Sequence, residues 1–520
     1  MTTKNIILYS CVGIASFLSI PMVQAQSDSL RASYFHIQLY KAFTPDLHSE
    51  IASTLPFAPT LSYADIALHY TGSYGNFHRA QESSGISQLG FDAEGAIPTK
   101  NNYMSGGFHF SQDYKQNIRF NTLLNPYRGT PYQLVDSTCS KWKIQNYSMW
   151  TSLATEFINN RLAGGLRLTL DVARGAKMVD PRPRTNNSRI SATPSLSLQL
   201  GKQRLSGGVE YNRFREIANI ILYNTNDPQK IYALKGLGQY TYDIFSSTER
   251  ERHYHGNSIA GILSYQAQLG DFGFFLNGKY QNYGEEASDM ENSKPRLRGR
   301  FYDDTYKGDI QLSYKNSRWI HDFKAEYQDV NQSGREIIQV FNSDPEVNAW
   351  QTDSEAPGRW KAHNKAYKGR YNFAYLDKTS YYALFGLSAS VNYSNYSETY
   401  RVMDTWRKYK TTEYSIEPYF NRLLSKKQLV TIKLTAMIHR VSDFQTAYQG
   451  READDHLVEE LLIDYDNDLL RQNYYQTGIE LSYGYLLKKS TLLLTLSYNQ
   501  LQSQENQKRH YPTLSFSYHF

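Results

Sequence analysis

The sequence predicts an all-β fold, a transmembrane antiparallel up-and-down β-barrel of about 18 strands within a range of about 16 to 20. Three observations carry this prediction. The chain begins with an export signal, apolar and polar residues alternate with period two along most of its length, and the connections between these segments are short and long in turn. Such barrels lie in the outer membrane of Gram-negative bacteria, with short periplasmic turns and long outer loops.

The export signal occupies residues 1–25. Lys4 supplies a positive charge, the apolar stretch Ile6–Ile20 follows, and a small-residue cleavage site ends at Ala25. This order is that of a secretory signal peptide, and the apolar stretch is too short for a spanning helix, which needs about 20 residues. Cleavage leaves Cys139 as the remaining cysteine, so we expect no intramolecular disulfide.

The alternation is clearest in the last third of the chain. Val430, Ile432 and Leu434 share one face of a predicted strand, and Thr431 and Lys433 share the other. Such runs are about 10 to 14 residues long, which is the length that a tilted strand needs to cross a bilayer. The 44 tyrosines, against 6 tryptophans, suit strands that meet a membrane interface, because the ring and the hydroxyl prefer different environments.

The connections give the strands a direction. Gly201-Lys202, Gly270-Asp271 and Asn316-Ser317 are short, and we place them in the periplasm. Longer connections alternate with them and are predicted as outer loops at Asn125–Lys143, Arg174–Arg189, Arg215–Gly256, Gly284–Tyr302, Val330–Asn364, Tyr396–Lys410, Ser442–Arg471 and Gln502–His510. A soluble β protein has no reason to keep this asymmetry over so many steps.

The chain therefore divides into a signal peptide (1–25), an N-terminal segment (26–58) and the barrel (59–520). The N-terminal segment is predicted either to remain in the periplasm as a leader or to fold into the lumen, and it is too short for a separate plug domain. The strand count depends on the start of the barrel. A strand at Asn101–Ser111 and a further one at Ile86–Gly95 bring the predicted count to eighteen. Two more strands, at Pro59–Thr71 and Asn76–Ser83, would bring it to twenty.

The C-terminus ends in the same alternation. One face carries Leu514, Phe516, Tyr518 and Phe520, which resembles the C-terminal signal by which the barrel-insertion machinery recognises its substrates. We therefore expect that machinery as a partner, besides outer-membrane lipid and lipopolysaccharide. The net charge of +6 is modest and scattered, so nucleic acid is not an expected partner.

Charged residues of both signs are predicted to face the lumen. By strand parity they are Arg167, Asp171, Glu210, Lys279, Lys307, Asp309, Asp322, Lys324, Glu326, Lys368, Arg370, Lys433 and Glu480. They either line a water-filled pore and set its solute preference, or pair across the lumen or with the N-terminal segment and close it. The mixture of signs favours pairing.

Other patterns that could carry chemistry are weak. Residues 464–468 begin like a calcium loop, but Leu469 and Tyr475 stand where glycine and glutamate are needed. His253 and His255 alternate on one strand face, without a third metal ligand fixed by the sequence. No serine, histidine and acid are placed convincingly on neighbouring strands. We therefore expect no enzymatic activity, no metal site and no cofactor.

Two segments carry a resemblance to a known family. Val179–Asn187, a basic stretch with prolines, and Gly236-Leu237-Gly238 are similar to motifs of Tyr-rich, single-chain outer-membrane barrels of about this length, whose function is uncharacterised. The resemblance implies the fold and the location, and it implies no catalytic residues. The basic loop Arg174–Arg189, which contains the first of these segments, is interpreted either as a contact for anionic lipopolysaccharide or an anionic solute, or as a solvated rigid loop.

Three functions remain as hypotheses. The first is a channel or transport protein for small solutes, because the predicted barrel is wide and its lumen polar. The second is an accessory barrel that docks surface or periplasmic proteins in an uptake or export complex, because the outer loops are long. The third, with least support, is an outer-membrane hydrolase.

Overall fold

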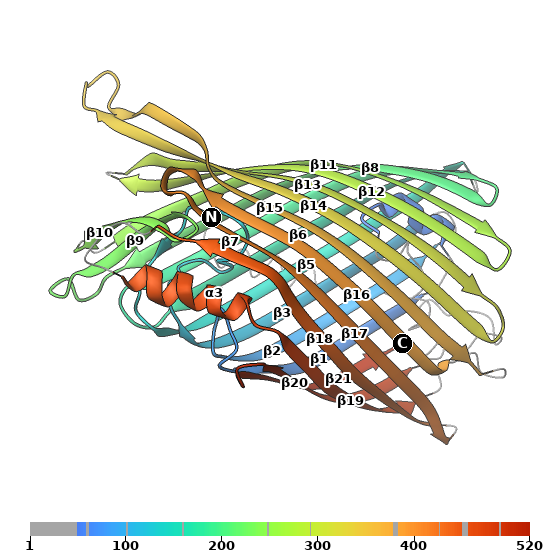
Figure 1. Cartoon of the computed structure of the whole chain (residues 1–520). Coiled ribbons are helices and arrows are strands. Elements are labelled where there is room, and N and C mark those ends of the chain that lie inside the picture. Colours follow the sequence, from blue (N-terminus) through green and yellow to red (C-terminus); the bar gives the residue numbers. More distant parts are fainter. Residues whose placement is uncertain are drawn as a thin grey trace.

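The computed structural model describes residues 49–58, 62–99, 102–158, 161–246, 249–291, 293–377, 383–425, 427–449, 456–487 and 490–520. The predicted signal peptide and most of the N-terminal segment lie outside these residues. Eighteen strands form one antiparallel sheet in which the last strand pairs with the first, so that Leu514 lies opposite Tyr70. The predicted fold class and the count of eighteen are confirmed. Figure 1 shows the strands lying side by side around the wall of the barrel.

The strands follow one another around the wall in chain order. They are β1 (Tyr63–Gly75), β2 (Gly85–Pro98), β3 (Asn102–Ile118), β5 (Ser140–Ile158), β6 (Leu162–Lys177), β7 (Arg182–Leu200), β8 (Gln203–Ile221), β11 (Glu249–Leu269), β12 (Phe272–Glu291), β13 (Lys294–Lys315), β14 (Trp319–Asn342), β15 (Ala349–Leu376), β16 (Ala383–Tyr400), β17 (Thr405–Ser425), β18 (Gln428–Ala447), β19 (Tyr474–Leu486), β20 (Thr491–Ser503) and β21 (Lys508–His519). The short turns at Gly201-Lys202, Gly270-Asp271 and Asn316-Ser317 lie where they were predicted.

Period-two alternation makes these segments strands with an apolar outer face. Leu68, Leu263 and Phe323 are between 45% and 68% exposed, and many other large apolar side chains that alternate with inward polar residues are exposed as well. In water such exposure would be costly, but in a bilayer these side chains meet lipid. The sheet therefore presents an apolar band outward and a polar surface to the lumen.

Aromatic rings form two rows on the wall. In the row nearer the outer end, the ring centroids of Tyr280 and Tyr306 are 4.7 Å apart. In the row nearer the periplasmic end, those of Trp319 and Tyr375 are 4.6 Å apart. Two such girdles mark the two interfaces of a bilayer, where an aromatic ring reaches apolar chains and its polar group reaches water.

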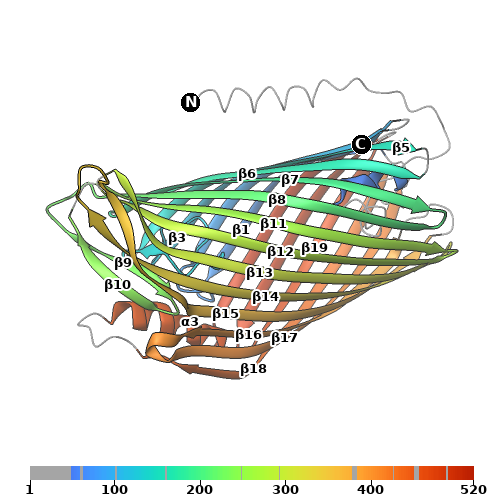
Figure 2. The same ribbon diagram turned by 90° about the horizontal axis from the view of Figure 1, so that it is seen from above.

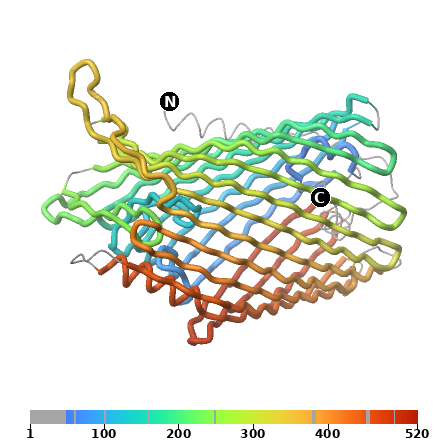
Figure 3. The backbone as a smooth tube through the Cα atoms, turned by 45° about the horizontal axis from the view of Figure 1, so that its top comes forward, coloured from blue at the N-terminus to red at the C-terminus, as the bar shows by residue number. Residues whose placement is uncertain are grey.

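Five predicted outer loops are wrong in part, because their residues continue the ladder. Strands β14 and β15 run to Asn342 and from Ala349, which replaces most of the predicted loop Val330–Asn364. The predicted loops Arg174–Arg189, Gly284–Tyr302, Tyr396–Lys410 and Gln502–His510 likewise shrink to short turns. The ladder there is held by charged pairs instead of an apolar face, for example Arg335 with Glu355 at 2.9 Å, and a strand outside the bilayer needs no lipid-facing residues. Figure 3 shows the hairpin of β14 and β15 projecting beyond the rest of the wall.

The start of the barrel also differs in detail. The predicted segment Pro59–Thr71 corresponds to β1, whereas Asn76–Ser83 forms a connection and adds no strand. Asn101–Ser111 is the first half of the longer strand β3. These differences bring the count to eighteen and exclude twenty among the described residues.

The remaining connections contain short elements of their own. They are η2 (Ala52–Phe57), β4 (Leu134–Val135), β9 (Gln229–Gly236), β10 (Gln239–Phe245), η3 (Arg401–Met403), η4 (Glu459–Asp464) and α3 (Tyr465–Leu470). Strands β4, β9 and β10 form a separate three-stranded sheet. None of the helices in the described part of the chain is long and apolar enough to span a membrane.

Candidate functional site, a capped lumen

Three outer connections pack together over one end of the barrel. We call residues 119–139, 229–245 and 456–473 the cap. Their apolar side chains share one buried cluster, which contains Phe120, Val135, Tyr232, Leu234, Val458, Leu462 and Ile463. Burying apolar area at about 25 cal/mol per Å² holds loops that have no strand ladder to join. Figure 2 shows α3, β9 and β10 gathered at this end.

The first cap segment crosses the bore. It leaves β3 and returns to β5, yet Gly129 and Tyr132 lie against β13 and β14, which are nearly half the circumference away. A Cβ atom at Gly299 of β13 would lie 2.6 Å from the Tyr132 ring, so the ring occupies the space that a side chain would fill. Backbone pairing of Leu134 with Ala233 joins this segment to the second one.

A buried arginine fixes the crossing segment to the far wall. The Arg128 guanidinium forms ion pairs with Glu216 of β8, at 3.2 Å, and with Glu285 of β12. The rings of Phe214 and Tyr254 lie 4.8 and 4.9 Å from the guanidinium carbon. We call this arrangement the Arg128 latch. Burying a charge costs free energy. Here the two carboxylates and the two rings around the planar guanidinium offset that cost.

Two further ion pairs hold the cap. Lys177, at the end of β6, pairs with the buried carboxylate of Asp136. Arg79, in the connection after β1, pairs at 2.9 Å with Asp466 of α3 and lies 3.7 Å above the Tyr127 ring. Burial alone would lower the pKa of Arg79, but Asp466 together with Tyr127 and Tyr409 outweighs burial and raises that pKa. The cap is therefore tied to the wall at several points around the rim.

The Gly236-Leu237-Gly238 motif forms the tip of the β9–β10 hairpin. All three residues have positive φ, of 107°, 45° and 71°, which favours glycine. A Cβ atom would lie 2.2 Å from Trp360 at Gly236 and 2.3 Å from Ile463 at Gly238. The motif therefore lets the hairpin tip lie directly on β15 and on the third cap segment.

The Val179–Asn187 motif positions the start of the second cap connection. The Asp180 carboxylate accepts hydrogen bonds from the backbone N–H groups of Tyr223 and Asn224, at 3.0 and 2.9 Å. The Arg182 guanidinium lies 4.4 Å from the Tyr223 ring centroid, and Arg184 donates to the Tyr223 hydroxyl. Within the structure this basic stretch thus contacts its own chain.

The cap leaves a cavity of about 740 Å³ beneath it, which we call the chamber. Its lining combines aromatic rings with hydroxyl and amide groups, and its charged residues are Arg79, Glu82, Lys115 and Arg509. Aromatic lining residues are Phe77, Tyr127, Tyr409, Tyr474 and Tyr511. Its size lies in the range of about 300 to 1,000 Å³ that holds small ligands.

The periplasmic end of the lumen contains η2, which lies opposite α3 in Figure 2. Ser53 bonds to the inward serines of β7, with its N–H 3.1 Å from the Ser195 hydroxyl and its own hydroxyl 2.7 Å from that of Ser197. Leu55 packs with Tyr63 and other buried residues of the neighbouring strands. The described part of the N-terminal segment, residues 49–58, therefore lies inside the barrel.

Several predicted lumen charges pair along the wall. Lys279 pairs with Glu210 at 3.2 Å and with Glu50 of the N-terminal segment at 2.7 Å. Glu326 lies 2.6 Å from Lys324 and 3.9 Å from Lys368. Lys433 pairs at 2.8 Å with Glu417, which is not among the predicted lumen charges.

The remaining lumen candidates bond to neutral groups or stand alone. Arg167 contacts Ser152 and Trp150, which are both neutral. Asp171, Asp309 and Asp322 likewise accept hydrogen bonds from neutral side chains. Lys307, Arg370 and Glu480 make no ion pair or hydrogen bond with another described residue. These contacts join neighbouring strands, and their role in a pore remains a prediction.

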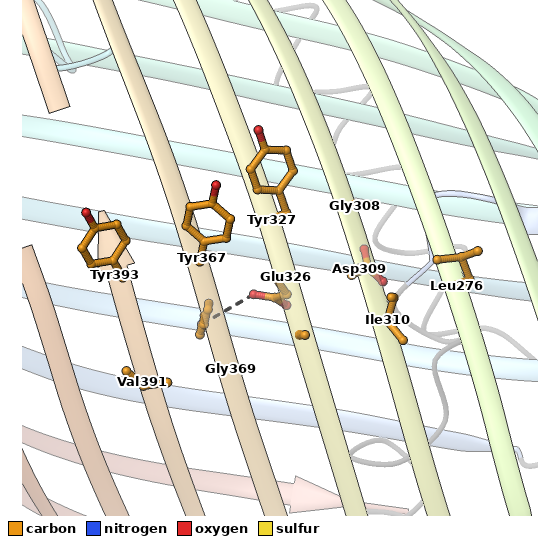
Figure 4. Close-up of a pocket in the computed structure, with 12 residues that line it drawn as sticks. Leu276, Gly308, Asp309, Ile310, Glu326, Tyr327, Tyr367, Gly369, Val391 and Tyr393 are labelled. Atoms are coloured by element: carbon orange, nitrogen blue, oxygen red, sulfur yellow. Dashed lines mark ion pairs between the residues drawn. The ribbon is translucent and has the colours of Figure 1, made fainter. Parts of the chain in front are cut away.

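A second depression, of about 470 Å³, lies between β12 and β16. Tyr327, Tyr367 and Tyr393 stand side by side along it (Figure 4), and apolar Leu276 and Val391 complete its edge. These side chains belong to the exposed outer face of the wall. The depression is therefore part of the lipid-facing surface, and the chamber is the candidate site.

The predicted C-terminal signal lies on the seam of the barrel. Leu514, Phe516 and Phe520 are about half exposed on the outer face, and the Tyr518 and Phe520 rings are 5.4 Å apart. Phe520 exchanges two backbone hydrogen bonds with Ala64, at 2.7 and 2.9 Å. Its role in assembly stays a prediction.

The inner face of this seam contains a grouping that was not predicted from the sequence. The Ser517 hydroxyl lies 2.8 Å from His519 Nε2, and His519 Nδ1 lies 2.7 Å from Asp65 Oδ1. The expectation that no serine, histidine and acid meet on neighbouring strands is therefore wrong. Asp65 is far from the other two in sequence, and the closing pairing of β1 with β21 brings them together.

The structure adds no support for a metal site at residues 464–468 or at His253 and His255. Residues 464–468 are mostly helical, and Asp466 is held by Arg79 and by the Ala80 N–H. His253 instead lies 3.1 Å from Glu251. In the described part of the chain, no three His, Cys, Asp or Glu residues are grouped to hold a metal ion.

These features define a class of protein, an outer-membrane β-barrel whose own connections fill its outer mouth. Within this class the chain belongs to DUF6850, a family of unknown function whose model matches residues 52–520. This membership confirms the resemblance seen in the sequence. No curated protein matches the chain.

Solved barrels are similar to the chain only at low identity. BauA, the ferric preacinetobactin receptor from Acinetobacter baumannii, is 8% identical with a TM-score of 0.41, over 89% of this chain and 80% of that chain. The RagAB peptide transporter is 7% identical with a TM-score of 0.40, over 88% and 86%. FyuA, the ferric yersiniabactin uptake receptor from Yersinia pestis, is 10% identical with a TM-score of 0.40, over 88% and 80%. Similarity at this level carries no information on substrates.

Proposed function

We propose that the chain is a gated transport barrel for small solutes, in which the cap is the gate and the chamber holds the solute. A barrel of sixteen or more strands is wide enough for an aqueous path unless something fills it. The cap fills the outer mouth, and the observation that carries the proposal is the Arg128 latch across the bore. A pore blocker that is fixed mainly by side chains can be released without breaking the wall.

The chamber supports a solute with both apolar and polar faces. Ring faces of Tyr409 and Tyr474 offer apolar area, and hydroxyl and amide groups lie between them in the lining. The lumen below has charges of both signs, and about half of them form ion pairs with neighbouring residues. Such a lumen lets polar solutes pass without a strong preference for either charge.

The Arg128→Met variant tests the gate. Removing the guanidinium leaves two buried carboxylates without a cation, and breaking a buried pair costs about 3–5 kcal/mol. We expect this cost to release the cap while the wall stays folded. Planar-bilayer conductance and liposome swelling should therefore be low for the wild type and rise at least tenfold for the variant.

Arg335→Met is the matched control, because Arg335 pairs with Glu355 on the exposed hairpin and such pairs contribute about 0–1 kcal/mol. It should behave as the wild type does. If the Arg128→Met variant shows neither bilayer conductance nor liposome swelling, the transport proposal is contradicted. A wild type that already conducts as freely as the variant would contradict the gate.

A second candidate function, docking of other envelope proteins, has one observation in its favour. Residues 337–342 of β14 pair only with β15, and Ile338 and Val340 expose half or more of their surface beyond the wall. An exposed ribbon with apolar side chains is a surface on which a partner strand can pair. Isolation from native membranes as a lone monomer would count against docking, and a partner that is lost when residues 338–354 are deleted would support it.

A further inference from the structure

The inner face of the β1–β21 seam holds the three side chains of a nucleophilic relay. Ser517 and His519 are two residues apart on one strand, so both face the lumen, and Asp65 lies directly opposite His519 in the register. The hydroxyl-to-Nε2 distance is 2.8 Å and the Nδ1-to-carboxylate distance is 2.7 Å. These are the two hydrogen bonds by which a base activates a serine and an acid orients the base.

The order of the three groups fixes the histidine tautomer. With the Nδ1 proton donated to the Asp65 carboxylate, Nε2 is left with a lone pair toward the Ser517 hydroxyl. Ser517 and His519 are each 8% exposed, which restricts the access of water to both side chains.

The residues beside Ser517 suit a small acyl group. Ala67 of β1 and Leu493 of β20 lie opposite Ser517 on its two sides, and Leu493 is buried. Thr491, also buried, lies opposite His519 on β20 and brings a hydroxyl to the same row. An acyl transfer needs a hydrogen-bond donor for the developing oxyanion, and we assign the Thr491 hydroxyl to that role.

We propose that Ser517, His519 and Asp65 form a serine esterase site for small acyl esters at the periplasmic end of the lumen, an activity separate from transport. The Ser517 Oγ forms a bond to the ester carbonyl carbon, and its proton passes to His519 Nε2. The ester C–O bond then breaks, and the leaving alcohol takes that proton. Water, deprotonated by His519, releases the acyl group as a carboxylic acid and restores the serine.

Labelling of the folded, full-length protein with a fluorophosphonate probe tests this site directly. We expect one adduct, located at Ser517 by peptide mass spectrometry, and hydrolysis of p-nitrophenyl acetate by the same preparation. Ser517→Ala should abolish the adduct and reduce the hydrolysis at least tenfold. Ser515→Ala is the matched control, because Ser515 is on the same face of β21, two residues away, and it should retain both.

The relay itself is tested by Asp65→Asn, which keeps the shape of the side chain but disfavours the required tautomer. We expect labelling at least tenfold slower, with the heat-dependent gel migration of a folded barrel unchanged. Wild-type protein that takes no label at Ser517, or that is labelled equally fast after Asp65→Asn, would overturn the proposal. Neither result depends on conductance, so the failure of this site and the failure of the transport proposal are distinguishable.

Discussion

Single small residues determine how closely the inserted segments lie on the barrel wall. A Cβ atom at Gly165 of β6 would lie 2.3 Å from the Ser53 nitrogen of η2, and one at Gly299 would lie inside the Tyr132 ring contact. Both positions have ordinary strand backbones, so the glycine is needed for space and not for its φ angle. The wall thus carries two recesses, one for η2 at the periplasmic end and one for the cap.

Gly165→Leu should displace η2. Overpacking of this kind costs about 1–3 kcal/mol, and η2 has no ladder of its own to resist it. In a Cys139→Ser background, Ser53→Cys should be protected from a maleimide reagent, and it should become reactive once Gly165→Leu is added. Gly261→Leu is the control, because nothing lies within 4 Å of a Cβ at that position. Equal protection with and without Gly165→Leu would contradict the lumen position of η2.

The strands could be predicted from the sequence where they cross the bilayer, because contact with lipid requires apolar side chains on one face. In β14, Phe323 and Tyr327 face outward while Asp322 and Lys324 do not, and this alternation marks the strand within the bilayer. Beyond it, polar residues occupy both faces of the same strand, so no pattern distinguishes a ladder in water from a loop. This is why the extensions of β12 to β15 were predicted as loops.

The closing element also makes the terminal signal testable. Phe520 anchors the seam through its two backbone bonds to Ala64 and exposes its ring to lipid. Phe520→Ala keeps the backbone bonds but removes the ring, so we expect the amount of assembled barrel in outer-membrane fractions to fall several-fold. The barrel that does assemble should unfold at nearly the wild-type temperature. Unchanged assembly would argue against the signal, and Leu501→Ala, in a buried position of β20, serves as a control for general loss of packing.

At the scale of the whole molecule, the cap and the relay depend on pairings between distant parts of the chain. Arg79 meets Asp466, and Asp65 meets His519, only because the barrel closes. The shared face of Ser517 and His519 could be seen in the sequence, and an up-and-down barrel places the first strand beside the last. The register between β1 and β21 could not be predicted, since alternation leaves a strand free to slide by two residues.

The orientation of the whole barrel can be checked on intact cells. Residues 343–348 form the exposed tip of the β14–β15 hairpin, at the end where the cap lies, and Glu50 lies at the other end. In a Cys139→Ser background, Glu346→Cys should react with a membrane-impermeant maleimide on intact cells. Glu50→Cys should react only after the outer membrane is permeabilised. The reverse result would show that the barrel has the opposite orientation in the membrane.

The strands of the barrel differ in length, and this difference affects which part of the protein is reached first from outside the cell. Strand β15 has 28 residues and β1 has 13, so one side of the barrel is roughly 50 Å longer along its strands than the other. The rim is therefore slanted, and its high point is the hairpin tip around Asn348. We expect an antibody or a bacteriophage that approaches the cell to meet this tip first, and the low side of the rim to lie nearer the membrane surface.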